Sequence, residues 1–206
     1  MSIDGYVAGP NQSLEIPLGE GGEALHNWMF ETKTWHEMQG ETGGARGIND
    51  DVLRENHANI GTAIMGRNMF GGGPGPWETS WHGWWGENPP YHHPVFVLTH
   101  YPREPLVMQG GTTFFFVTDG IASALRQAKK AAGAKDIAVI GGAKALQQYL
   151  AAGLLDEIEI HVVPLLLRGG ERLLDNLDGS NVQLEPARTV AGPGVTHLKY
   201  RVVKQG

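Results

Sequence analysis

The residues best suited to chemistry in this sequence are two adjacent glycines, Gly141 and Gly142, that follow an apolar run at residues 137–140. The run predicts a strand that is covered on both faces. Apolar residues then recur at helical spacing from Ala143 until Gly153, which predicts a short helix. Backbone without side chains lets a ligand approach closely, and the first N–H groups of a helix attract an anion such as a phosphate. The alternative is a tight turn that binds no ligand.

Two other predicted strands end in residues of the same kind. Gly66 and Arg67 follow one strand, and Thr99 and His100 end another. Ligands of open parallel sheets bind outside the carboxyl ends of the strands, so the three ends together suggest one long ligand with several phosphates. Arg67 could fork onto a phosphate, or it could be a solvated arginine at a helix start. The sequence contains neither the Gly-x-Gly-x-x-Gly dinucleotide fingerprint nor a P-loop.

The segment 71–93 gathers four of the six tryptophans and three histidines. Its aromatic rings could stack on a flat heterocycle, or they could serve packing, including packing against a partner subunit. His92 and His93 would point apart on an extended segment and have no carboxylate at ligand spacing, so we expect structural histidines and no metal site.

Composition bounds the class of protein. The chain has 206 residues, 41% of them apolar, which fits one domain spanning residues 1–206. No apolar run approaches the roughly 18 residues that a membrane span needs, and the N-terminus lacks the pattern of a signal peptide. There are no cysteines, and the net charge of −6 argues against a nucleic-acid partner. We therefore expect a cytoplasmic protein that acts on a small molecule and binds neither nucleic acid nor membrane.

Strands that alternate with helices, followed by closing strands, predict an α/β protein with a mostly parallel central sheet and an antiparallel C-terminal hairpin. The expected strands are 3–8, 62–65, 94–99, 113–117, 137–140, 157–163 and two strands within 182–203 joined across 191–194. The expected helices are one capped at 49–51 and running to about 59, one capped by Thr118 or Asp119 and closed by Gly133, and one from Ala143 to Gly153.

The strand at 157–163 alternates between apolar and polar residues. This pattern buries one face and leaves Glu157, Glu159 and His161 facing water or a partner. Together with the aromatic segment, that face suggests a homodimer.

Five segments of the chain, in this order, carry a family resemblance: MSIDGYVAGP, IMGRNMF, PVFVLTHYPREPL, IAVIGGAKALQQYLAAGLLDE and PLLLRGGERLL. The set resembles the dihydrofolate-reductase-like family, and more closely the branch that includes the C-terminal reductase domain of riboflavin biosynthesis (the RibD C-terminal type). The resemblance covers nearly the whole chain. It implies a three-layer α/β/α fold with a sheet of eight to nine strands that binds NADPH in extended form across the strand ends.

The resemblance also implies which residues contact the cofactor. Gly66 to Asn68 would lie against its phosphates, Thr99 and His100 near the adenosine ribose and its 2′-phosphate, and Gly141 to Lys144 around the pyrophosphate, often with a cis bond between the two glycines. Tyr6 to Gly9 would flank the nicotinamide. The full cofactor-binding set implied is Ala8, Gly9, Gly66, Arg67, Asn68, Thr99, His100, Gly141, Gly142, Ala143 and Lys144.

Two acids are candidates for the catalytic carboxyl. Counting back from Met65 by the family's interval places the acid that grips a pterin ring at Asp50, whose alternative role is to cap the helix together with its neighbours. Asp4, in the SIDG segment, is the second candidate, and its alternative role is that of a turn aspartate. Family members usually carry several more strand residues before this segment, so we expect either a start site upstream or a shortened first strand.

These features predict an NADPH-dependent oxidoreductase that transfers a hydride to a small pterin- or pyrimidine-like heterocycle. One alternative is 5-amino-6-(5-phosphoribosylamino)uracil reductase of riboflavin biosynthesis. Its phosphorylated substrate needs a basic cluster, for which the loops offer only the scattered Lys33, Arg46 and Arg54. Another alternative is a nucleotide-binding module with weak catalysis. The absence of cysteine excludes the zinc deaminase signature of a bifunctional enzyme.

Overall fold

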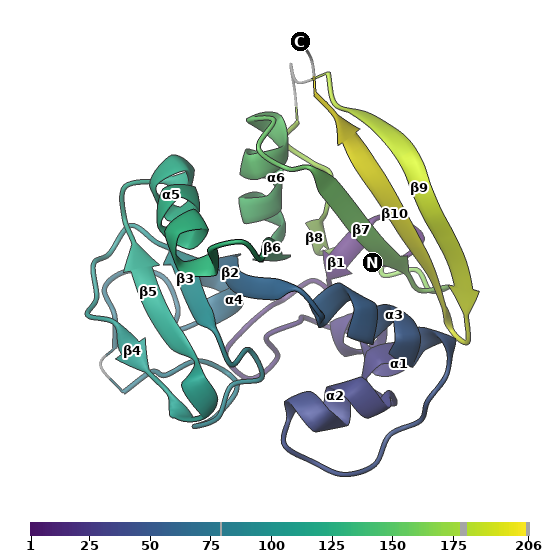
Figure 1. The fold of residues 1–206 in the computed structure, drawn as a ribbon, viewed down its shortest axis with the longest axis horizontal. Helices are drawn as coiled ribbons and strands as arrows, with labels where there is room; N and C mark the ends of the chain where they lie inside the picture. Colours follow the sequence, from purple (N-terminus) through teal and green to yellow (C-terminus); the bar gives the residue numbers. More distant parts are fainter. Residues whose placement is uncertain (79, 178–180, 205–206) are drawn as a thin grey trace.

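The computed structural model describes residues 1–78, 80–177 and 181–204. Its central sheet has five strands in the spatial order β4-β5-β3-β2-β6, all parallel except β4 (Figure 1). The strands are β2 (Ile60–Gly66), β3 (Pro94–Leu98), β4 (Leu106–Val107), β5 (Thr113–Val117) and β6 (Asp136–Gly141). The predicted α/β fold with a mostly parallel sheet is confirmed.

The C-terminal hairpin is also confirmed, as part of a separate antiparallel sheet with the order β7-β10-β9. Its strands are β7 (Glu157–Val162), β9 (Gln183–Gly192) and β10 (Val195–Val203), and a third, two-stranded sheet pairs β1 (Tyr6–Ala8) with β8 (Glu171–Arg172). The described strands therefore form three sheets instead of one sheet of eight to nine strands. Met1 lies beside β7, where its ammonium group donates a hydrogen bond to the His161 carbonyl oxygen at 2.6 Å.

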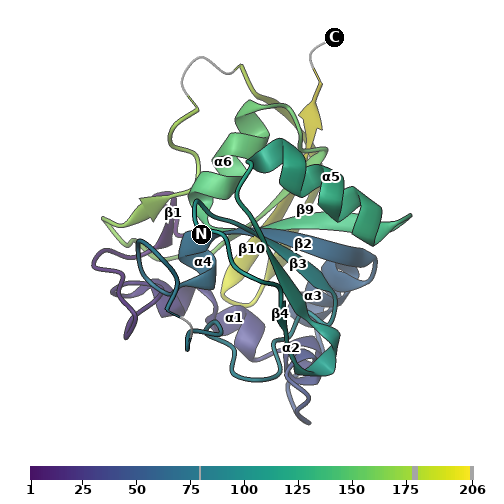
Figure 2. The same cartoon turned by 90° about the vertical axis from the view of Figure 1, so that its left-hand side faces the viewer.

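Two helices, α5 and α6, cover one face of the five-stranded sheet (Figure 2). The helices are α1 (Asn27–Phe30), α2 (Lys33–Met38), α3 (Ile48–His57), α4 (Arg67–Phe70), α5 (Ile121–Ala132) and α6 (Ala143–Ala151), with short 3₁₀ turns at Gly22–Leu25 and Gln109–Gly111. Gly133 ends α5 as predicted, but Gly120 is its N-cap and no side chain caps it, so the predicted caps Thr118 and Asp119 are wrong. No described helix is long and apolar enough to cross a membrane.

Alternation along the strands divides the core between the two faces of the sheet. Ile64 and Phe96 pack beneath α5 and α6. The neighbouring residues Met65 and Val97 point to the other face, where they pack around Phe70 of α4. Because α4 is short, most of this second face must be covered by the loop that follows it.

The described part of the segment 71–93 provides that cover. Trp85 stacks on Phe114 of β5 with ring centroids 5.8 Å apart, and Phe70 meets Trp77 edge to face. The three rings are partly buried, and each indole N–H donates to a backbone carbonyl oxygen: Trp77 to Tyr101, Trp81 to Phe70 and Trp84 to Met69. The aromatic segment thus serves packing within its own chain.

The strand β6 differs from its prediction. The apolar run at residues 137–140 predicted a strand covered on both faces, yet all four residues are partly exposed. The reason is the strand order, because β6 is the last strand of its sheet and pairs only with β2.

The predicted exposed face of β7 is wrong at one position. Glu157 pairs with Lys199 of β10 at 2.7 Å, as a surface residue would. His161, in contrast, packs against Trp28 of α1, with ring centroids 4.7 Å apart. Helices cover the end of this face, so it is not available as a whole to a partner.

His161 belongs to a hydrogen-bonded chain whose proton positions can be assigned. Asn49 donates through its amide nitrogen to the Pro193 carbonyl oxygen, which turns its amide oxygen toward His197 Nε2 at 3.1 Å. His197 Nε2 therefore carries the proton, and its Nδ1 accepts from His161 Nδ1 at 2.8 Å. Asn49 thus forms hydrogen bonds to the β9–β10 hairpin. The N-cap of α3 is Gly47, so the predicted cap at 49–51 is wrong.

We expect this pair to make stability depend on pH. Burial, helped by the nearby charge of His197 and of the N-terminus, lowers the pKa of His161 to about 3. Since the unfolded value is roughly 6.5, the stabilisation is complete above that pH and is lost as pH falls toward the folded pKa. The free energy of unfolding should therefore fall by about 1.4 kcal/mol per pH unit for this one proton.

Urea unfolding at a series of pH values measures this slope. His161→Gln should flatten it, whereas the control His82→Gln, at an exposed position, should leave it unchanged. An unaltered slope in the His161 variant would refute the assignment.

Candidate functional site

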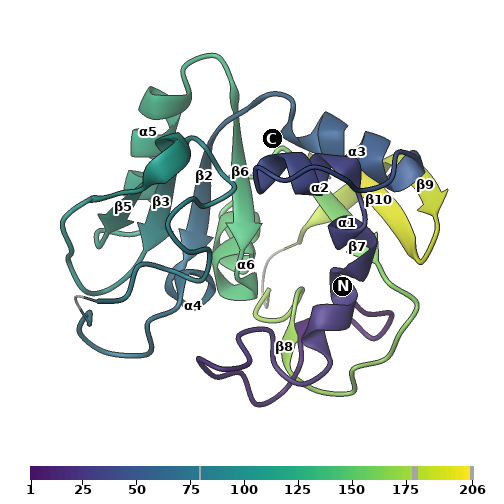
Figure 3. The same ribbon diagram turned by 90° about the horizontal axis from the view of Figure 1, so that it is seen from below.

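Three neighbouring parallel strands present the predicted phosphate-binding groups at their carboxyl ends, which lie side by side. Gly66, the last residue of β2, lies opposite Leu98 of β3, and Met65 lies opposite Gly141 of β6. Strands lie about 4.8 Å apart, so the ends of β3 and β6 are separated by roughly 10 Å. Figure 3 shows β3, β2 and β6 side by side, with α4 and α6 beginning where β2 and β6 end. The predicted meeting of these strand ends is confirmed.

Gly141, the last residue of β6, and Gly142 form a compact elbow with a cis peptide bond between them, as the resemblance implies. A Cβ atom on Gly141 would come within 2.8 Å of the Met69 sulfur, so this position is closed. A Cβ atom on Gly142 would meet nothing within 4 Å, so this position faces open space. One side of the elbow therefore packs against α4 and the other is free to receive a ligand.

The helix that follows the elbow completes an anion seat. Gly142 is the N-cap of the nine-residue α6 and contributes no side-chain cap. Its carbonyl oxygen accepts the Ala145 N–H, while the N–H groups before that one have no acceptor within the helix. Lys144 is exposed in the same turn and adds a positive charge. Unpaired donors and the helix dipole together favour a phosphate here.

Arg67, at the end of β2, is already held by the chain. Its guanidinium donates to the carbonyl oxygens of Gly71, Gly72 and Gly73 at 3.3, 3.4 and 2.9 Å, and to Thr99 Oγ1 at 3.4 Å. The guanidinium carbon lies 3.3 Å from the centre of the Trp77 ring. The Arg67 guanidinium group, which was predicted to bind a phosphate, therefore holds the glycine-rich start of the segment 71–93 instead.

A second arginine, Arg103, lies near the same strand ends and was not predicted as a site residue from the sequence. The Arg103 guanidinium lies 5.3 Å from the centre of the Trp77 ring and 5.2 Å from that of Phe116. Its Nη1 atom is buried and has no hydrogen-bond partner. Burial lowers the pKa of Arg103, and burial and the charge of Arg103 both lower that of Arg67. The segment THYPREP quoted for the resemblance contained this residue, but nothing in its spacing distinguished it.

The remaining predicted cofactor residues vary in exposure. Asn68 and His100 are exposed, and Thr99 is 8% exposed. Ala8 and Gly9 are buried, and a Cβ atom on Gly9 would lie 1.9 Å from the Glu20 carbonyl oxygen. Ala8 and Gly9 therefore pack closely against the backbone of the loop that follows them.

Asp50 is 2% exposed and forms part of the helix-helix contact near the N-terminus of α2. Its Oδ1 accepts the Thr34 N–H at 2.7 Å, and its Oδ2 lies 3.5 Å from Arg54. Burial acts to raise the pKa of Asp50, but the hydrogen bonds from Thr34 and the charges of Arg54 and Arg46 outweigh it, so the net shift is downward. The carboxylate is therefore ionised near neutral pH.

Asp50 also lines a cavity of about 300 Å³ between α2 and α3. The three cations that looked scattered in the sequence meet there. The cavity is lined by Lys33, Thr34, Glu37, Arg46, Asp50, Asp51 and Arg54. Lys33 pairs with Glu37 and Arg54 with Asp51, whereas no ion pair of Arg46 occurs among the residues described.

Asp4, the second candidate acid, is fully engaged by the chain. Its Oδ1 accepts the Leu167 N–H at 3.2 Å and its Oδ2 accepts the Arg168 N–H at 2.7 Å. The hydrogen bond from the Ser2 hydroxyl, and then those from Arg168 and Leu167, lower the pKa of Asp4. This carboxylate anchors the segment that leads into β8.

The residues at the strand ends fit the nucleotide that the resemblance implies. The open elbow offers donors to a pyrophosphate, and the unpaired Arg103 Nη1 offers a charged donor to a further phosphate. In the part of the chain that the structure describes, no three His, Cys, Asp or Glu residues come together as metal ligands.

The order of elements and the elbow define a dihydrofolate-reductase-like fold. The sequence matches the model of the RibD C-terminal domain over residues 1–198, and the chain belongs to that family. No curated protein gives a significant match.

Solved structures agree on the fold. A protein from Shewanella sp. PV-4 described as a riboflavin biosynthesis protein is 23% identical, with 99% of this chain and 96% of that chain covered and a TM-score of 0.60. A pyrimidine reductase-like protein from Corynebacterium diphtheriae is 11% identical, with coverages of 83% and 85% and a TM-score of 0.50. Acinetobacter baumannii RibD is 14% identical with a TM-score of 0.53; the match covers 98% of this chain but only 55% of RibD.

We expect the two neighbouring acids of α3 to differ in their contribution to stability. Asp50→Ala removes the acceptor of a buried N–H group, which should lower the free energy of unfolding by about 1–3 kcal/mol. Asp51→Ala, its matched control, removes a half-exposed ion pair worth about 0–1 kcal/mol. Denaturant unfolding of both variants measures the difference, and equal losses would contradict the role given to Asp50.

Proposed function

We propose that this chain is an NADPH-dependent reductase that transfers a hydride to a pterin- or pyrimidine-like heterocycle. The observation that carries the proposal is the row of strand ends, in which the open glycine elbow after β6 lies next to Arg67 at the end of β2 and two strands away from Arg103, beyond β3. Membership of the RibD C-terminal domain family supports the same class of reaction. A nucleotide with phosphates spaced along its length matches this row.

The residues of the chain would act mainly by position and charge. NADPH would supply the hydride when bound. The N–H groups at the start of α6 would hold the pyrophosphate, and the segment around Ala8 and Gly9 would flank the nicotinamide. Reduction of a C=N or C=O bond also takes up one proton. Since their lowered pKa values keep Asp50 and Asp4 ionised, neither would supply its own proton, which would come from water. Asp50, which lines a cavity, is the carboxylate better placed to orient the substrate, because Asp4 is bound by the Leu167 and Arg168 N–H groups.

A charged side chain in the elbow tests the phosphate seat. Gly142→Asp places a carboxylate in the open space next to the first N–H groups of α6, so it should weaken NADPH binding at least about 100-fold. Lys144→Glu, on the same turn but outside the elbow, should weaken it less, by about tenfold. Titration calorimetry gives both dissociation constants.

Ala151→Asp is the matched control, because it adds the same charge at the exposed far end of α6. Thermal melting of each variant establishes that it is folded. Unchanged affinity in both Gly142→Asp and Lys144→Glu would remove the basis of the proposal.

Turnover separates a reductase from a nucleotide-binding module. The chain should consume NADPH, seen as loss of its near-ultraviolet absorbance, with an oxidised pterin or a ribosylamino-pyrimidine. Tight NADPH binding without turnover of either class would favour the module.

A phosphorylated pyrimidine is the second candidate substrate, as in the reductase step of riboflavin biosynthesis. The observation that favours it is the cavity beside Asp50, where Lys33, Arg46 and Arg54 lie together. Glu37 and Asp51 already pair with two of these cations, so Arg46 is the one best able to bind a substrate phosphate.

Arg46→Gln should therefore discriminate between the two substrates. It should raise the KM for the phosphorylated ribosylamino-pyrimidine about fivefold, since one exposed charged hydrogen bond is lost, and leave the KM for its dephosphorylated form unchanged. Steady-state kinetics with the two compounds measures this. An equal effect on both would show that the cavity does not bind the phosphate.

A further inference from the structure

Glu171, on β8, has a carboxylate that the rest of the chain does not use. The residue is partly exposed, and no hydrogen bond or ion pair of its side chain occurs among the residues described. The two candidate acids predicted from the sequence are in the opposite state. Asp50 accepts the Thr34 N–H and lies 3.5 Å from Arg54, whereas Asp4 accepts two backbone N–H groups.

The backbone of Glu171 is fixed on one side by β1. Glu171 lies opposite Ala8 in the β1–β8 pair, where the two Cα atoms of such a pair are about 5 Å apart. Gly170, the residue before it, has φ of 113°, and a Cβ atom there would come within 2.1 Å of the Ala8 carbonyl oxygen. Because only glycine permits this close approach, Glu171 is held immediately next to Ala8.

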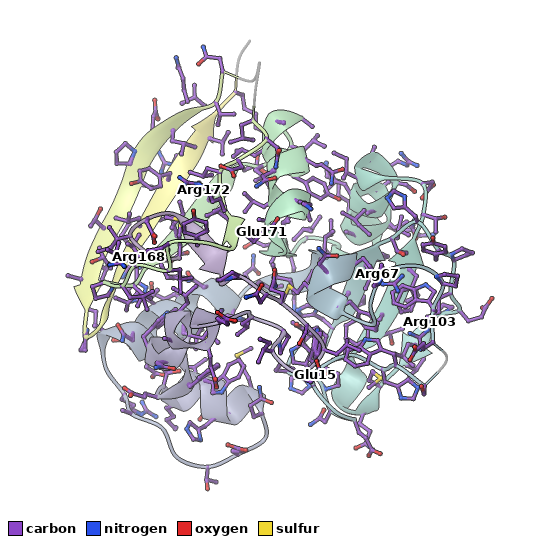
Figure 4. The ribbon with its side chains drawn as sticks, turned by 180° about the vertical axis from the view of Figure 1, so that it is seen from behind. Glu15, Arg67, Arg103, Arg168, Glu171 and Arg172 are labelled. Atoms are coloured by element: carbon purple, nitrogen blue, oxygen red, sulfur yellow. The ribbon has the colours of Figure 1, made fainter. Side chains whose placement is uncertain are left out.

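The helix α6 fixes β8 from another side. The buried Gln147 donates from Nε2 to the Arg172 and Leu173 carbonyl oxygens at 3.0 and 3.2 Å. Gln147 is about one helical turn from Ala143, where α6 begins after the elbow. Figure 4 shows Glu171 between β1 and α6. Glu171 therefore lies between the segment proposed to flank the nicotinamide and the turn proposed to hold the pyrophosphate.

The side chain of Glu171 is separate from that of its neighbour. Arg172 extends over the Tyr6 ring, 5.2 Å from its centre, and pairs with Asp175 at 3.2 Å. Since successive side chains of a strand point to opposite faces, Glu171 does not share these contacts. A carboxyl group that is free, on a backbone that is held from two sides, is suited to act on a bound molecule.

We propose that Glu171 is the catalytic acid that protonates the substrate during its reduction, an inference that rests on the proposed function. The carbon of the reduced C=N or C=O bond receives the hydride from NADPH, and the nitrogen or oxygen receives the proton of the Glu171 carboxyl group. The carboxylate that remains takes up a proton from water. The step therefore yields the reduced substrate and NADP⁺ without a further reactant.

The dependence of turnover on pH tests this role. Glu171→Gln should lower kcat about 100-fold or more with the substrate class that the chain reduces, because a positioned general acid is lost. The fall of kcat with rising pH, which is expected of an acid that must carry its proton, should disappear in this variant. Glu171→Ala should regain activity in proportion to added formate, a small acid that fits the vacated space. A merely structural role would give no such rescue.

Two controls separate catalysis from support. Asp175→Asn removes a neighbouring acid of the same segment and should change neither kcat nor its pH dependence. Calorimetric titration with NADPH and thermal melting give readouts that do not depend on turnover. Neither the NADPH affinity nor the melting temperature of Glu171→Gln should fall, because the backbone contacts of β8 remain. A fall in either would show that Glu171 supports the cofactor or the fold instead.

The outcomes distinguish this inference from the proposed function. If the unaltered chain reduces neither substrate class, the reductase proposal fails and the inference fails with it. If the chain reduces a substrate while Glu171→Gln keeps both its rate and its pH dependence, the role of Glu171 is overturned and a reductase remains supported.

Discussion

The candidate site depends on the parallel register of three strands. Hydrogen bonding of β2 to β3 on one side and to β6 on the other brings Leu98, Gly66 and Gly141 to one edge. Because successive side chains of a strand point to opposite faces, a slip of β2 by one residue would turn Met65 away from Phe70 and move the end of β2 relative to the elbow. The apolar side chains that alternate between the two faces therefore fix the spacing of the three strand ends, although they lie away from those ends.

Charge is distributed differently in the two regions that carry polar groups. At the strand ends, Arg67 and Arg103 both lie against the Trp77 ring, and among the described residues neither forms an ion pair. Between α2 and α3, by contrast, three cations and three acids line the same cavity and mostly neutralise one another. The first region attracts a multiply charged anion, whereas the second suits a polar, nearly neutral molecule with at most one phosphate. Under the proposed function, the first region would bind the cofactor and the second the substrate.

Periodicity predicted the elements well because it depends on local packing. The strands β2, β3 and β5 and the helix α5 were predicted within a few residues, since each has a regular apolar face. The partners of Arg67 could not be predicted, because they are backbone carbonyls of glycines and leave no side-chain signal. The cavity beside Asp50 also escaped prediction, since its cations come from separate segments that only the packing of α2 on α3 brings together. For β6, the apolar run gave the strand correctly but not its place at the end of the sheet.

That place leaves one side of β6 without a partner among the described strands. Along one side of β6, N–H and C=O groups are not paired with another described strand, and the only charged residue of the strand is Asp136 at its beginning. Natural edge strands usually carry lysine, proline or a covering loop, which prevent a neighbouring molecule from adding a strand. Here β6 lies between β2 and the two smaller sheets, inside the outline of the molecule (Figures 1 and 3). Its place in the fold, and not its own residues, therefore keeps other molecules from adding a strand to this side.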